Sequence, residues 1–291
     1  MMRKIAVPIL AFLLQCGFSL SSASAQVFDE VYYTKESSFA LHGVLAFKSD
    51  YMFRGQNLYN GASFQPSIRP KLNTGIGSFY ADVAGKVAAD QGDTKSPEGG
   101  SFDAADANGD TVRTGAVIPA FDEVDVDAGY EADLDLLSVV LGHRWYSYSV
   151  HDDSPLFGRR TARLENTNEF HTLLDFNIPL HPHALLAYDY DQNKGLYYET
   201  GLRHSIPMTY GNKDNAVIPF VKLGLTAGLD DDQRPLYDKS GLAFVDAGVR
   251  GIFYIYPKVS LQPEIHYSEG VDDFTDSEFL FGMSLVGDMD F

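Results

Sequence analysis

Charged side chains recur at alternate positions along several stretches of this sequence. Asp125 and Asp127 flank Val126, and Arg69 and Lys71 flank Pro70. Residues two apart in a β-strand point to the same face, so these charges would gather on one side of a sheet. Such a face can attract and steer ions or form internal ion pairs. The candidates for it are Arg69, Lys71, Lys86, Asp125, Asp127, Arg144, Asp175, Glu199, Arg203, Lys222, Asp246, Arg250 and Glu264.

The predicted polar face is close to neutral. With Lys48, Asp82 and Asp288 added, it carries eight basic and eight acidic residues. The whole chain has a formal net charge of -18. We therefore expect most of the negative charge in the connections between strands.

Two short motifs contain metal-ligand residue types. His181-Pro182-His183 has no third ligand nearby, and a metal site needs at least three. Asp106, Asn108 and Asp110 place oxygen atoms at alternate positions, as a calcium loop does, but its glycine is misplaced and its terminal glutamate is absent. We expect no metal, with these three residues as a weak calcium candidate and a solvated acidic loop as the alternative.

The sequence contains no recognisable catalytic motif. Cys16 is the only cysteine, and it lies in the segment that we expect to be removed. No Ser-His-Asn hydrolase arrangement and no nucleotide fingerprint occurs. The sequence therefore predicts no catalytic residues, no cofactor and no enzymatic activity.

The composition excludes several classes of protein. Acidic residues number 40 against 22 basic ones, so a nucleic-acid partner is not expected. After the first two dozen residues, no apolar run reaches the ~20 residues of a transmembrane helix. Apolar residues make up 45% of the chain and aromatic residues 13%, which argues against disorder.

The N-terminus has the features of a secretory signal peptide. Arg3 and Lys4 precede a short apolar core, and small residues at positions 23 and 25 indicate cleavage before Gln26. The predicted divisions are therefore 1–25 as signal peptide, 26–37 as an N-terminal periplasmic segment and 38–291 as the folded domain.

The folded domain alternates apolar and polar residues with a period of two. One such stretch contains Ala243, Val245, Ala247 and Val249. About 12 stretches of this kind occur, most of them as long as the ~9–11 residues of a tilted transmembrane strand. Long acidic connections alternate with tight turns, except that a short turn follows Tyr190 and a long one follows His204. The pattern predicts an all-β fold: a transmembrane antiparallel up-and-down β-barrel with short periplasmic turns and longer acidic outer loops.

The end of the chain resembles the closing strand of an outer-membrane barrel. Apolar residues alternate from Phe279 and Phe281 to Phe291, the aromatic C-terminal residue. Such a strand resembles the signal by which barrels are recognised for assembly. We expect these three phenylalanines to form the assembly signal.

A second resemblance follows the first predicted strand. The run Ser49-Asp50-Tyr51-Met52-Phe53-Arg54-Gly55 is similar to a signature of the TorF family, exported bacterial proteins of poorly defined function regarded as outer-membrane channels. The resemblance implies a porin-like barrel. From the residues themselves, Gly55 would permit a turn, and Arg54 would pair with a loop carboxylate or serve only the turn.

These observations predict a porin-like channel in the cell outer membrane for passive diffusion of small polar solutes or ions, with weak cation preference. Alternatives are a closed barrel acting as a surface binding or structural protein and, more weakly, a lipid-modifying enzyme. The expected partners are outer-membrane lipid, lipopolysaccharide, the barrel assembly machinery and small solutes or ions. Assembly into a homo-oligomer stays open.

Overall fold

The computed structural model describes residues 38–54, 56–59, 61–88, 103–105, 111–113, 122–148, 166–192, 194–210, 213–228, 240–271 and 277–291. Both the predicted signal peptide and the weak calcium candidate, at positions 106, 108 and 110, lie outside the described residues. Within the described ranges, no helix has the length and apolar character needed to cross a membrane.

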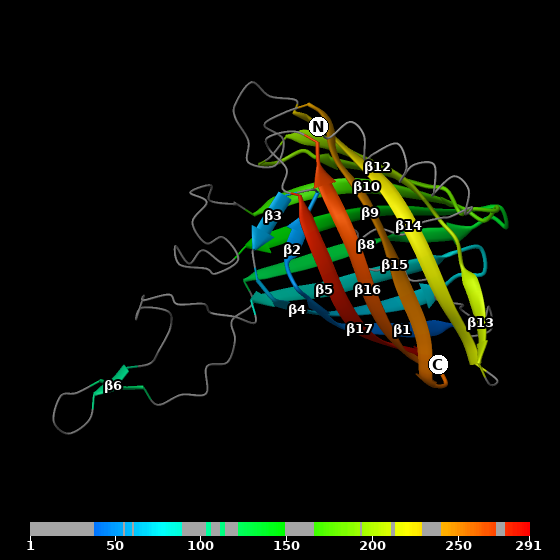
Figure 1. The fold of residues 1–291 in the computed structure, drawn as a ribbon, viewed down its shortest axis with the longest axis horizontal. Helices are drawn as coiled ribbons and strands as arrows, with labels where there is room; N and C mark the ends of the chain where they lie inside the picture. Colours follow the sequence, from blue (N-terminus) through cyan, green and yellow to red (C-terminus); the bar gives the residue numbers. More distant parts are fainter. Residues whose placement is uncertain are drawn as a thin grey trace, which may run out of the picture.

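Twelve long strands form one closed antiparallel sheet (Figure 1). Each strand pairs with the next along the chain, while β1 pairs with β17 and β12 pairs with β14, so no edge is left open. This confirms the predicted up-and-down barrel. Its strands are β1 (Phe39–Lys48), β4 (Ser63–Asn73), β5 (Ser78–Ala88), β8 (Glu123–Asp133), β9 (Leu137–Tyr148), β10 (Thr167–Phe176), β11 (His183–Asp189), β12 (Gly195–Arg203), β14 (Lys213–Gly228), β15 (Gly241–Tyr256), β16 (Val259–Gly270) and β17 (Glu278–Asp290).

Five short strands lie outside the barrel sheet or extend it. The pairs β2 (Tyr51–Phe53) with β3 (Gln56–Tyr59) and β6 (Asp103–Ala105) with β7 (Thr111–Arg113) form separate hairpins. The fifth, β13 (Ile206–Tyr210), pairs with the start of β14. This extra hairpin accounts for the long connection that follows β12, which the sequence pattern left unexplained.

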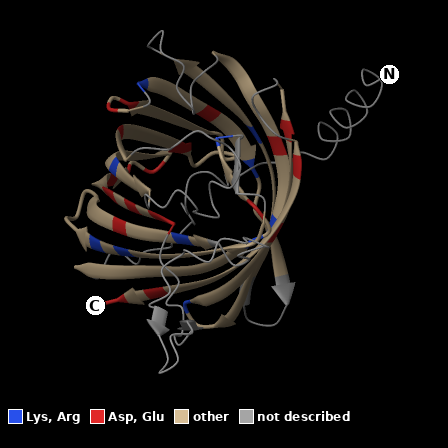
Figure 2. Cartoon of the chain, turned by 90° about the vertical axis from the view of Figure 1, so that its left-hand side faces the viewer, with Lys and Arg blue, Asp and Glu red and all other residues tan. Residues whose placement is uncertain are grey.

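The two faces of the barrel wall differ in polarity. Leu45, Leu141 and Phe279 are 50%, 52% and 61% exposed on the outer face. Charged residues at the alternating positions, such as Lys222 and Asp246, are each 2% exposed on the inner face. Figure 2 shows the strands curving around a common axis, with acidic and basic residues on many of them. A charged interior inside an apolar exterior is the arrangement that a lipid surrounding would select.

One strand departs from the predicted alternation. The pairing of β14 with β15 shifts register between Gly224 and Leu225, which indicates a bulge. As a result Ala243 and Phe244 are both 2% exposed, whereas Leu242 faces outward at 37%. The prediction that Ala243 lies on the outer face is therefore wrong, because the extra residue of a bulge reverses the alternation beyond it.

Candidate functional site: a hairpin across the barrel interior

The end of the barrel that bears the longer connections also bears the β2–β3 hairpin. We call it the loop end; it carries the connections 49–62, 89–122, 149–166, 190–194, 229–240 and 271–277. The hairpin follows β1 directly and pairs only with itself. The sequence pattern predicted a long polar connection over 51–62, and the structure corrects this to a hairpin whose side chains Tyr51 and Phe53 are 5% and 4% exposed. Its buried aromatic residues explain the difference, since they pack against the inner face of the wall.

Arg54, at the turn of the hairpin, reaches the opposite wall of the barrel. Its guanidinium donates a hydrogen bond to the Glu169 carboxylate on β10 and lies 4.6 Å from the centre of the Tyr197 ring on β12. In the strand order, β10 is five steps from β1 in one direction and β12 is five steps away in the other. The hairpin therefore crosses the interior and narrows it near the loop end.

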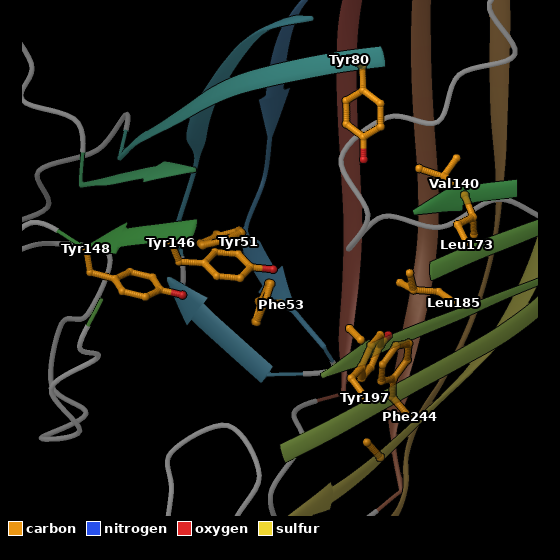
Figure 3. Packing of buried hydrophobic residues seen from close by; sticks show 12 residues of the cluster. Tyr51, Phe53, Tyr80, Val140, Tyr146, Tyr148, Leu173, Leu185, Tyr197 and Phe244 are labelled. Carbon is orange, nitrogen blue, oxygen red and sulfur yellow. The ribbon is translucent and has the colours of Figure 1, made fainter. Parts of the chain in front are cut away.

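The hairpin is held at its base as well as at its tip. Tyr51 donates to Glu123 Oε1 at 3.1 Å, and the Lys86 ammonium donates to the Tyr51 hydroxyl and lies 4.4 Å from its ring centre. Burial, with the negative charge of Glu123 and then Asp125, raises the pKa of Tyr51 well above its usual value, so this tyrosine stays a neutral donor. Figure 3 shows Tyr51 and Phe53 gathered with residues of the β9 wall.

Other residues of the Ser49–Gly55 motif have structural roles. Phe281 donates its backbone N–H to Ser49 Oγ at 3.1 Å, and Ser49 donates its own N–H to the Phe281 carbonyl at 2.9 Å. The motif thus extends the seam between β1 and β17 before the chain turns inward. Arg54 has φ +53°, a left-handed conformation that is uncommon for a residue with a Cβ atom. Gly55 lies outside the described residues.

The charged residues predicted for one face lie together in ion pairs. Arg144 pairs with Asp127 at 2.6 Å on neighbouring strands. Lys71 on β4 reaches Glu131 on β8 at 2.7 Å across the intervening strand β5, so the two side chains lie on the same face of the wall. The remaining predicted residues pair as Arg69 with Asp82, Lys86 with Glu123 and Asp125, Arg203 with Asp175, Lys222 with Glu199 and Asp246, and Arg250 with Glu264.

The buried charges are more acidic than the sequence pattern indicated. Among the described residues, ten carboxylates and seven lysines or arginines are buried. Glu123, Glu169 and Asp189 were not among the predicted residues, although each is at an inward position of its strand. Glu123 and Glu169 each lie one residue before the first apolar residue of a predicted stretch, and Asp189 lies inside the predicted stretch 184–190, so the period of two contains all three.

A cavity remains beside the hairpin. Lys48, Tyr51, Phe53, Asp125 and Tyr146 are among its lining residues. No group of three or more His, Cys, Asp or Glu side chains that could hold a metal ion occurs in the described part of the chain. The chemistry of this region is thus electrostatic and aromatic.

Comparisons with known proteins agree with the fold. No family model matches the chain, and no curated relative matches it; membership of the TorF family stays a prediction. The COG4313 outer membrane channel from Pseudomonas putida F1 is 13% identical, with a TM-score of 0.53 over 91% of this chain and 100% of that one. LpxR from Salmonella typhimurium (9% identity, TM-score 0.44, 85% and 99%) and the KdgM porin (8%, 0.43, 85% and 98%) also match. The closed strand order and the likeness to the COG4313 channel show that the chain has the fold of an outer-membrane β-barrel.

Proposed function

We propose that this chain is a narrow outer-membrane channel that passes small polar solutes or ions by passive diffusion, with a weak preference for cations. The observation that carries the proposal is the barrel's inverted polarity, with a charged interior and an apolar exterior. A closed barrel leaves no unpaired backbone groups in lipid. The fold shared with an outer-membrane channel supports the same role.

The preference for cations rests on the excess of buried carboxylates. Among the described residues, ten buried acidic groups stand against seven buried basic ones, and this excess would make the interior negative. The acidic connections, with much of the chain's net charge of -18, would add to it at the mouth. Negative clefts raise the local concentration of cations and repel anions before entry.

We further propose that the chain is exported through the periplasm, with cleavage before Gln26, and inserted by the barrel assembly machinery. Outer-membrane lipid and lipopolysaccharide would then contact the apolar outer face. The loop end would face the outside, because barrels of this type carry short turns on the periplasmic side.

The second candidate is a barrel whose interior is blocked, so that it does not conduct, and one observation favours it. Each of the 13 predicted interior charges belongs to an ion pair, and the hairpin crosses the interior. Such a barrel would act as a surface binding or structural protein.

Liposome swelling distinguishes the two candidates. Liposomes that contain the folded protein should swell in isotonic solutions of small solutes such as glycine or arabinose, and less in solutions of a trisaccharide. Protein-free liposomes and liposomes that contain the heat-denatured protein are the controls. If the folded protein gives no swelling with any solute, the proposed channel function is wrong and the barrel with a blocked interior is favoured.

A further inference from the structure

We infer that Glu169, Tyr197 and Tyr146 on the barrel wall form a binding site for the guanidinium group of a solute, a site that the chain's own Arg54 fills as a tethered ligand. The inference deepens the proposed channel function by naming the chemical group that the interior recognises. A test of the site by conductance depends on the proposed channel function, whereas a test by binding does not.

The contacts of Arg54 are those by which proteins recognise a guanidinium. A carboxylate oxygen of Glu169 accepts a hydrogen bond from Nη2, and the ring of Tyr197 on the wall lies 4.6 Å from the planar group. A second ring, 4.7 Å away, belongs to Phe53 of the hairpin itself. A guanidinium is planar and weakly hydrated, so it favours a carboxylate at its edge and rings at its faces. A spherical ammonium ion uses only the charge of such a site.

The wall part of the site is ordered by contacts that do not involve Arg54. Tyr146 donates to Glu169 Oε1 at 3.1 Å, and Tyr197 donates to Glu199 Oε2 at 2.6 Å. Glu169, Tyr146 and Tyr197 are 1%, 2% and 0% exposed. Their positions would survive withdrawal of the hairpin, and the buried Glu169 carboxylate would then require another cation.

The neighbouring cavity shares Tyr146 with the site, and a solute would approach from there. Phe53 and Tyr146 line this cavity and lie in ring contact with each other, with centroids 5.7 Å apart. The hairpin pairs only with itself and not with the barrel wall. Exchange of Arg54 for a solute guanidinium therefore leaves every strand pair of the barrel intact.

The test is chemical rescue of Arg54→Ala. In this variant the hairpin loses the contacts of its tip, so we expect the single-channel conductance to rise and the thermal midpoint of the folded barrel to fall. Millimolar guanidinium chloride should raise the midpoint and lower the conductance again, because the ion refills the site; so small a ligand can bind only weakly. Two controls should neither raise the midpoint nor lower the conductance. They are urea, a neutral planar molecule of the same shape, and ammonium chloride at equal ionic strength.

The double variant Arg54→Ala/Glu169→Gln is the matched control and should not respond to guanidinium. If Arg54→Ala folds poorly, refolding with and without guanidinium gives the same readout as recovery of the folded band. Equal effects of guanidinium and ammonium, or an equal response of the double variant, would overturn the site. Stabilisation by guanidinium without any conductance would support the binding site and contradict the channel function. Conductance without stabilisation by guanidinium would support the channel function and contradict the binding site.

Discussion

The backbone N–H of Phe291 donates a hydrogen bond to the carbonyl oxygen of Phe39 at 2.9 Å, and the two rings lie 5.7 Å apart. These residues join the last strand to the first, and β1 pairs with β17 from Ala40–Asp290 to Lys48–Gly282. The seam is what removes the two sheet edges that lipid cannot satisfy.

Deletion of Phe291 should therefore impair insertion. The variant loses a hydrogen bond and a ring contact at the seam, and it loses the aromatic end of the predicted assembly signal. We expect less of the heat-modifiable folded form in membranes on unheated gels, with Phe291→Tyr as the control that keeps the ring. Equal folded yield for the deletion and the control would show that the closing strand is recognised by other means.

Lys86 is predicted to stabilise the loop end strongly. Its ammonium donates to Glu123 at 2.5 Å and to Asp125 at 3.0 Å, and all three side chains are buried. Lys86→Met leaves two carboxylates without their cation, so we expect a loss of about 3–5 kcal/mol of unfolding free energy. Urea titration of the folded barrel in detergent measures it.

Lys258→Met is the matched control for Lys86→Met. Lys258 also pairs with a carboxylate, Asp290 at 2.7 Å, but its side chain is 54% exposed. Water and salt screen this pair, so its loss should cost about 0–1 kcal/mol. Similar losses for the two variants would mean that the Lys86 cluster is open to water.

Gly142 is predicted to be intolerant of a side chain. A Cβ atom there would lie 2.4 Å from Cε1 of His171 and 2.5 Å from the Tyr80 hydroxyl, both of which pack on the inner face of the wall. Gly142→Ala should destabilise the barrel by about 1–3 kcal/mol. Gly43→Ala meets nothing within 4 Å and should have little effect. Urea midpoints that shift equally for both would contradict the packing described here.

The reversal potential across a salt gradient should indicate cation preference. Charges on hydrated connections are screened beyond about 8–10 Å at physiological salt, whereas buried charges are screened much less. We expect the preference to weaken as mean ionic strength rises and to keep a residual part that comes from the wall. An anion preference would show that basic residues such as Arg69 and Arg203 control the filter.

The barrel could be predicted from the sequence because the alternation of apolar and polar residues within each strand shows which residues face outward and which face inward. In most strands an outward apolar residue such as Ile68 or Phe170 belongs to a series that repeats every second position, and no distant partner is needed to see this. Ala243 was misplaced because a bulge depends on the pairing of two strands, which a single strand does not reveal.

The site could not be predicted to the same extent. The motif drew attention to Arg54, but its partner Glu169 lies 115 residues away along the chain. The inward phase of β12 predicts that Tyr197 faces the interior, yet nothing local shows that a hairpin from β1 reaches it. Contacts across the interior depend on the closure of the whole barrel.

Single-channel conductance with and without the hairpin tests the central claim most directly, namely that an open barrel is narrowed by residues 51–59. The comparison uses the wild-type protein and a variant in which a glycine–serine linker of equal length replaces these residues, both shown to be folded by heat modifiability. We predict that the wild-type protein conducts and that the variant conducts severalfold more. Equal conductance in the two proteins, or none in either, would contradict the account.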